Sequence, residues 1–189
     1  MKRLHQVVLL ASTVALSWFA MMAVHVAGHV LGAWISGGTV SKVVLHPLTI
    51  SRADVSPNPQ PLVVIWAGPV IGVLAPLLMW ITTQLCGIPI WHLCRFFAGF
   101  CLIANGAYLG VGSFDHIGDA GDLMRHGADT WQLWLFGIIC APSGFLLWHR
   151  LGPHFGLGEA QGVVSIPSAY GCLIVLIAIG TLMAMFGGE

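Results

Sequence analysis

The first long apolar run of the chain ends in the stretch Ala23-Val24-His25-Val26-Ala27-Gly28-His29-Val30-Leu31-Gly32. Its two histidines are four residues apart, so on a helix they lie on the same face, one above the other. This is the spacing with which an H-E-x-x-H motif offers two imidazoles to a single metal ion. Here the second position of the motif is Val26 rather than glutamate. The stretch therefore predicts a helix that carries two metal ligands, His25 and His29, without the general base that the motif places between them.

The composition is that of an integral membrane protein. Of the 189 residues, 57% are hydrophobic and 7% are charged, whereas a soluble domain carries about 25% charged residues. There are 7 basic and 7 acidic residues, so no basic surplus indicates a nucleic-acid partner. The 5 cysteines lie mostly within apolar runs without a C-x-x-C pair, which favours small hydrophobic side chains over a disulfide framework. We expect a multi-pass protein in contact with membrane lipid, and we assign it to the bacterial inner (plasma) membrane.

The apolar pattern predicts an all-α fold, a polytopic bundle of about five transmembrane helices that forms a single membrane domain over residues 1–189. The run Val7–Val24 is longer than the roughly 7–15 residue core of a signal peptide and close to the roughly 20 residues that span a bilayer. A cleaved signal peptide is the alternative, but cleavage near Ala23 would strip the two histidines of their helix. Further spans are expected at about 61–84, 90–111, 131–148 and 166–186.

Glycines and a β-like segment mark the connections between these spans. Gly37-Gly38 is expected to end the first helix. The pattern from Thr39 to Ser51 predicts a short β-hairpin with its turn around His46-Pro47. In the second span Gly68 and Gly72 are small residues four apart, which lets another helix approach closely.

Three aspartates fall within eight residues beside the third span, namely Asp115, Asp119 and Asp122. Two carboxylates about 5 Å apart repel each other by roughly 3 kcal/mol at an effective dielectric constant near 20. A bound dication would relieve this repulsion; a solvated loop outside the bilayer is the plainer alternative. Because a catalytic zinc ion takes three protein ligands and leaves a fourth position for water, His25, His29 and one of these aspartates would complete a site.

The other histidines are scattered along the chain, and we interpret them as structural or interfacial. His116 is the one expected to lie closest to the ligands, as a hydrogen-bonding neighbour. The rest are His5, His46, His92, His126, His149 and His154. A different class of function would use them: a membrane haem-binding or electron-transfer protein could pair His25 or His29 with His92 as axial ligands. The four-residue spacing argues against this alternative, because one helix face suits one small ion better than two axial positions.

The order of the motifs in this sequence resembles that of the site-2 protease family of intramembrane zinc metallopeptidases. Ala23 to Gly38 resembles the first core helix of the family, which reads H-E-x-G-H, then small residues, then Gly-Gly. Val43–Ile50 matches the short β element that follows, and Ala67-Gly68-Pro69 resembles the Ala-Gly-Pro of the second core helix. Asn105 and then Asp119-Ala120-Gly121-Asp122-Leu123-Met124-Arg125 resemble the third, with its asparagine and its Asp-Gly-Gly-x-Leu-Leu-Arg. The resemblance covers residues 10–126 as a protease-like core of three helices, and residues 127–189 add two spans.

The resemblance implies a zinc site formed by His25, His29 and Asp119, with Asp115 as the substitute for the third ligand. Two departures stand out. Val26 replaces the glutamate that in this family activates the metal-bound water, and the gap from Asn105 to Asp119 is longer than usual and holds no proline. The resemblance therefore implies no catalytic residue at position 26. Asp122, one helical turn from Asp119, is a possible substitute base.

The expected function follows from the missing base. Loss of a general base typically costs about 10²–10⁴ in rate, so we expect a metalloprotease-like protein with reduced or no peptidase activity, a pseudoenzyme of the hydrolase fold. Whether any catalysis remains is left open. Such a protein could bind a transmembrane protein client, for which the hairpin at 39–51 would offer a strand edge. A plain membrane assembly protein without a cofactor is a further alternative.

Overall fold

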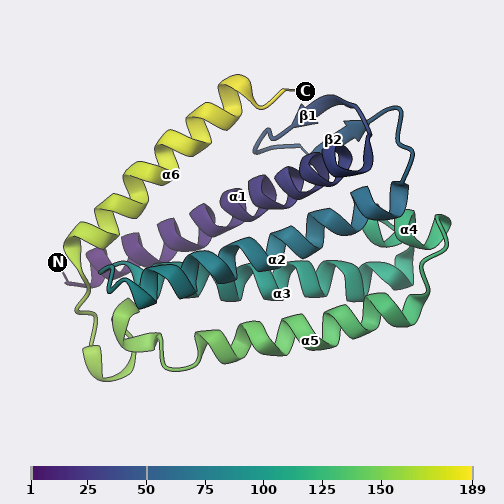
Figure 1. The fold of residues 1–189 in the computed structure, drawn as a ribbon. Helices are drawn as coiled ribbons and strands as arrows, with labels where there is room; N and C mark the ends of the chain where they lie inside the picture. The colour runs from purple at the N-terminus through teal and green to yellow at the C-terminus, as the bar shows by residue number, and fades with distance from the viewer. Residues whose placement is uncertain (1, 50, 189) are drawn as a thin grey trace.

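The computed structural model describes residues 2–49 and 51–188 as a bundle of long helices with a small sheet at one end (Figure 1). Five helices are long and apolar enough to cross a membrane. They are α1 (Lys2–Ser36), α2 (Pro61–Leu85), α3 (Trp91–Asp115), α5 (Thr130–Trp148) and α6 (Ile166–Phe186). The predicted all-α membrane fold with about five spans is therefore confirmed, and the chain is an integral membrane protein.

The ends of these helices follow local signals in the sequence. Helix α1 stops before Gly37, whose φ of 77° lies in the left-handed region that favours glycine. Helix α2 begins with Pro61, which lacks the N–H that the first turn leaves unpaired. Helix α5 begins with a capping box in which Asp129 and Gln132 each bond the other's backbone N–H. The predicted end of the first helix at Gly37-Gly38 is thus confirmed.

Small residues set the packing between the spans. Helix α3 packs along α5, and α1 lies between α2 and α6 (Figure 1). A Cβ atom on Gly137 of α5 would come within 2.9 Å of the Gly106 carbonyl oxygen of α3, and Gly144 and Gly99 face each other in the same way. Because lipid offers no hydrophobic drive for helix association, such close backbone contact is what holds membrane helices together.

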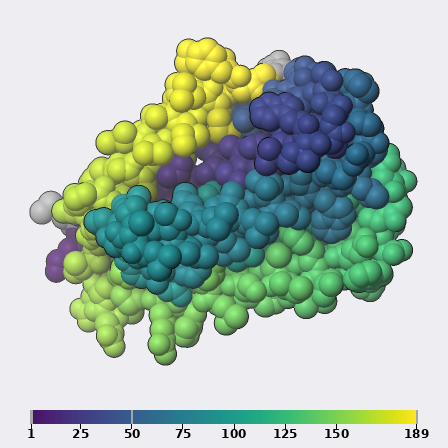
Figure 2. Space-filling model, viewed as in Figure 1, coloured from purple at the N-terminus to yellow at the C-terminus, as the bar shows by residue number. Residues whose placement is uncertain are grey.

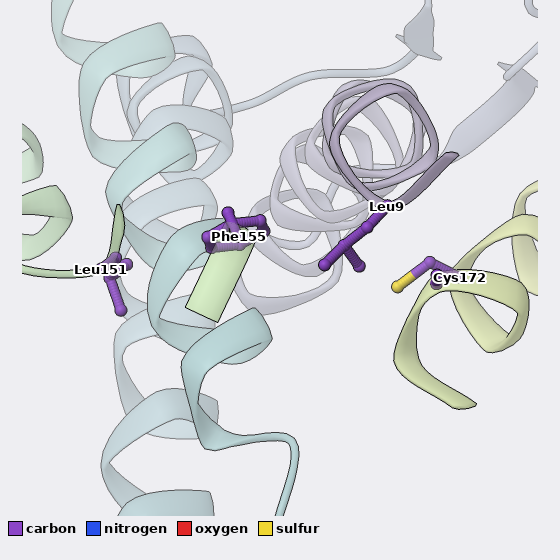
Figure 3. Close-up of a cluster of buried hydrophobic side chains, with 5 residues drawn as sticks. Leu9, Leu151, Phe155 and Cys172 are labelled. Atoms are coloured by element: carbon purple, nitrogen blue, oxygen red, sulfur yellow. The ribbon is translucent and has the colours of Figure 1, made fainter. Parts of the chain in front are cut away.

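Helix α6 lies along one edge of the molecule and packs against α1 (Figure 2). Its first half is fixed by an apolar cluster in which Leu9 of α1, Phe155 and Cys172 of α6 point toward one another (Figure 3). Phe155 belongs to the short 3-10 helix η1 (Gly152–Phe155), which is followed by η2 (Gly158–Ala160). At its other end α6 reaches the sheet, because the Leu45 N–H donates to the Gly187 carbonyl oxygen at 2.7 Å.

The sheet is an antiparallel pair of β1 (Val40–Val44) and β2 (Arg52–Val55). A hairpin after the first helix is confirmed, but its second strand begins later than predicted. Residues 45–49 form a turn in which the Thr49 N–H donates to the His46 carbonyl oxygen at 3.2 Å, and Pro47 has no N–H for a ladder bond. Ile50, which was expected in the strand, lies outside the described residues. Ser51 reaches across to α1, where its hydroxyl contacts the Met22 sulfur at 3.4 Å.

Candidate metal centre

Side chains from two helices converge on one point near the sheet end of the bundle. Helix α1 supplies His25 and His29, and the short helix α4 (Gly118–Arg125) supplies Asp119. The Asp119 Oδ2 atom lies 2.8 Å from His25 Nε2 and 3.3 Å from His29 Nε2, and the two Nε2 atoms are 3.0 Å apart. All three side chains are largely buried, so the structure brings the predicted histidine pair and the predicted aspartate into one group that could hold a metal ion.

The close approach of α2 to α1 fixes the position of the His29 imidazole. A Cβ atom on Gly68 would overlap the His29 ring, and one on Gly28 would overlap the Ala67 carbonyl oxygen. Gly72, one turn further along α2, faces the Asn105 side chain, where a Cβ atom would come within 2.9 Å of Oδ1. The expectation that Gly68 and Gly72 admit close neighbours is therefore confirmed.

The outer nitrogen of each imidazole is bonded to a group that can only accept. His29 Nδ1 lies 2.9 Å from the Val64 carbonyl oxygen, so this nitrogen carries the hydrogen. His25 Nδ1 lies 2.7 Å from Asn105 Oδ1. The Asn105 amide must face this way, because its Nδ2 donates to the Cys101 carbonyl oxygen at 2.9 Å. In its neutral form each imidazole would therefore turn an unprotonated Nε2 toward the other and toward Asp119.

The third member of the group is negatively charged. Burial raises the pKa of Asp119, but the hydrogen bonds with His25 and His29 outweigh this effect and lower it to about 2. Asp119 also lies in the first turn of α4, where the helix dipole favours a carboxylate. The hydrogen bonds of Asp119 with the two histidines require a proton between the Nε2 atoms and the carboxylate, and a bound cation would take the place of that proton. Outer hydrogen bonds of this kind are what hold metal-ligating histidines in the required tautomer.

The spacing of the donor atoms suits a small tetrahedral ion. Two ligand atoms at the usual bond length from tetrahedral zinc are roughly 3.3–3.4 Å apart. The three separations here, 2.8, 3.0 and 3.3 Å, are equal to or slightly shorter than this. Outward movements of a few tenths of an ångström would bring all three atoms to the spacing of zinc ligands.

The other two aspartates take different positions. Asp122 pairs with Arg125 at 2.7 Å on the exposed side of α4. Asp115 is the exposed last residue of α3 and lines the same cavity as His25 and Val26. Within residues 2–49 and 51–188, neither belongs to a group that could hold a metal ion. The structure therefore favours Asp119 over its substitute, and it gives no support to Asp122 as a base near the ion.

The side chains that surround His25, His29 and Asp119 were only partly predicted from the sequence. His116 ends α3 in the left-handed conformation, with φ of 53°, and its side chain is exposed. Asn105, rather than His116, forms the hydrogen bond with a histidine of the group. The resemblance had named Asn105 only as the asparagine of the third core helix. Tyr108 was missed altogether, although its ring lies edge-on to His25 with the centroids 5.9 Å apart. A tyrosine within an apolar run carries no sequence signal for such a contact.

His92 lies far from the histidine pair. Its ring stacks on His154 with the centroids 4.8 Å apart. Asn105, which contacts His25, follows His92 by 13 residues on the same helix, and this corresponds to about 20 Å. A haem ligated by His25 or His29 together with His92 therefore does not fit this arrangement.

A cavity of about 890 Å³ opens beside His25, between α1, α3 and the turn that joins the strands. Its wall is mainly apolar, with Trp18, Met22, Val26 and Val111 among the lining residues. Polar groups come from His25, Asn105, Tyr108 and Asp115. The group of potential ligands is thus approached from a largely apolar chamber at the side of His25.

The contact between Asn105 and His25 has a measurable consequence. Replacing Asn105 by alanine leaves the Nδ1–H of His25 without its acceptor, so we expect the affinity for an added metal ion, with Zn²⁺ as the probe, to fall about 10–100-fold. A chelator competition titration would measure this. Ser113→Ala is a matched control, since Ser113 is a buried polar residue of α3 bonded to Trp134 rather than to the site. Equal zinc affinity in Asn105→Ala and Ser113→Ala would contradict the role given to Asn105.

Comparisons with known proteins identify no relative: no family model, no curated protein and no solved structure matches the chain. A function can therefore be proposed only from the chemistry of the three converging side chains and from the order of the sequence motifs.

Proposed function

We propose that this protein is a zinc-binding homologue of the site-2 proteases, with reduced or no peptidase activity. The observation that carries the proposal is the convergence of the two Nε2 atoms and the Asp119 carboxylate within 3.3 Å of one another. Their tautomers are fixed by Val64 and Asn105. Such a donor set needs a proton or a cation at its centre, and a metal ion would satisfy all three atoms at once.

Zinc is the ion that this donor set suits best. Two imidazoles and one carboxylate are a usual ligand set of catalytic zinc, which leaves a fourth position open. When bound, the ion would polarise an oxygen-containing ligand and lower the pKa of water. The order of the sequence features, from the histidine pair through the hairpin and Ala67-Gly68-Pro69 to Asp119, supports the protease-like interpretation.

The missing base supports weak or absent peptidase activity. Val26 lines the cavity beside His25 and cannot accept a proton. Asp122 is engaged with Arg125 on the outer side of α4. A protein of this kind would hold a transmembrane client in the membrane, which we take to be the bacterial inner membrane, without cutting it efficiently. The two-stranded sheet after α1 is where an extended client strand could add.

The metal content of the purified protein tests this proposal. We expect about one zinc ion per chain in wild type, and none in Asp119→Ala, because two imidazoles alone do not retain the ion. Asp115→Ala is the matched control, since it removes a nearby carboxylate that lies outside the group, and its zinc content should equal that of wild type. Absence of metal from carefully purified wild type would overturn the proposal. Loss of zinc in Asp115→Ala alone would mean that the third ligand has been assigned one helical turn too late.

A further inference from the structure

Tyr108 is the one hydroxyl-bearing side chain that approaches both the histidine and the aspartate sides of the site within the described residues. Its oxygen accepts the backbone N–H of Asp119 at 3.0 Å. Its ring lies edge-on to His25, at 76°. Asn105 and Tyr108 are three residues apart on α3, so both face the same side and contact His25 from neighbouring turns. The hydroxyl is therefore fixed with respect to two of the three potential ligands.

The backbone before Asp119 is shaped to admit this hydroxyl. Gly118 has φ of 53°, and any Cβ atom at this position would overlap the Tyr108 oxygen. The tyrosine oxygen therefore reaches the start of α4 only because residue 118 is glycine. A side chain that needed only to fill apolar space would not require such an opening.

The hydrogen of the Tyr108 hydroxyl remains available for a ligand. One lone pair of its oxygen is used by the Asp119 N–H, and no acceptor for the O–H occurs in the part of the chain that the structure describes. Tyr108 also lines the cavity that opens beside His25, and 39% of its surface is exposed. A molecule that enters this cavity and approaches His25, His29 and Asp119 thus passes a free O–H donor.

We propose that Tyr108 is a ligand-binding residue, whose O–H donates to the second oxygen of a carboxylate that coordinates the ion through its first oxygen. The cavity would accordingly favour small carboxylates and carboxylate-bearing ligands with an apolar body, whose apolar part contacts the wall beside Val26 and Val111. This inference rests on the proposed metal site. It adds to that site the class of ligand and the residue that selects it.

Cobalt provides the test, because its visible absorption reports both occupancy of the site and the entry of a further ligand. The Co²⁺-loaded full-length protein is titrated with acetate and, separately, with thiocyanate, which binds a metal through one end and offers only a weak acceptor at the other. In Tyr108→Phe we expect unchanged cobalt content, acetate binding weakened about tenfold or more, and unchanged thiocyanate binding. Hydrogen bonds to charged acceptors are among the stronger hydrogen bonds in proteins, which is the basis of this factor.

The chain contains only one other tyrosine, and it provides the control. Tyr170 contacts His5 at the opposite end of the molecule, so Tyr170→Phe should bind acetate as wild type does. Equal acetate affinity in Tyr108→Phe and wild type would overturn the inference while leaving the metal site intact. Loss of cobalt from Tyr108→Phe would also overturn it, because the hydroxyl would then serve only to place Asp119. A wild type that takes up no cobalt would instead overturn the proposed function itself.

Discussion

Val26→Glu is expected to cleave a transmembrane model substrate measurably, whereas wild type cleaves it very slowly or not at all. Val26 follows His25 directly, is 1% exposed and lines the cavity. A glutamate here would place a carboxylate beside the site, where it could take a proton from the attacking water. The rate should rise about 10²–10⁴-fold, the usual contribution of a general base. Product formation in detergent or liposomes, with equal zinc content in both proteins, is the measurement.

Val26→Gln is the matched control for this gain. Glutamine has nearly the same size as glutamate, but its side-chain amide does not accept a proton. Its cleavage rate should stay at the level of wild type. Two other outcomes would change the interpretation. If neither wild type nor Val26→Glu cleaves despite bound zinc, the site has become structural. Robust cleavage by wild type that disappears in Asp122→Asn would mean that the base has moved and that the protein is an enzyme.

The second large effect is expected from Gly68→Ala. The added methyl group would occupy the space of the His29 ring, and the close contact between Gly28 and Ala67 would have to open for α1 to move away. We expect zinc to be lost and the free energy of unfolding to fall by about 1–3 kcal/mol, as for other overpacked sites. Elemental analysis and thermal unfolding would measure the two effects.

Gly171→Ala controls for the general effect of adding a methyl group to a spanning helix. No atom lies within 4 Å of the position that a Cβ atom would take on Gly171 in α6. This variant should keep its zinc and its unfolding temperature. Full zinc occupancy and unchanged unfolding in Gly68→Ala would show that α1 and α2 can separate without disturbing His29, and would contradict the account of the site given above.

The spans could be predicted from sequence because their signals are local. Apolar length gives the helices, and Gly37 and Pro61 mark two of their ends. The shared face of His25 and His29 follows from helical geometry alone. The hairpin was predicted with its second strand too early, because the position of β2 depends on pairing with β1 and not on local β propensity.

The third member of the His25, His29 and Asp119 group could not be derived from spacing alone. Helix α3 runs to Asp115, beyond the apolar run, and His116 then turns the chain in the left-handed conformation before α4 begins. Which aspartate faces the histidines depends on the residue at which this turn occurs, and hydropathy does not reveal it. Tyr108 could not be found for a similar reason, since its contact with Asp119 exists only after α4 has folded back onto α3.

The separation of the ligands along the chain has a consequence for synthesis. Asp119 follows His25 by 94 residues, and at a typical rate of translation this distance corresponds to roughly 5–20 s. During that interval α2 and α3 must enter the bilayer, and His25 and His29 have no contact with Asp119. Uptake of the ion would therefore mark the moment when the first three spans and α4 have come together, before the last two spans have been completed.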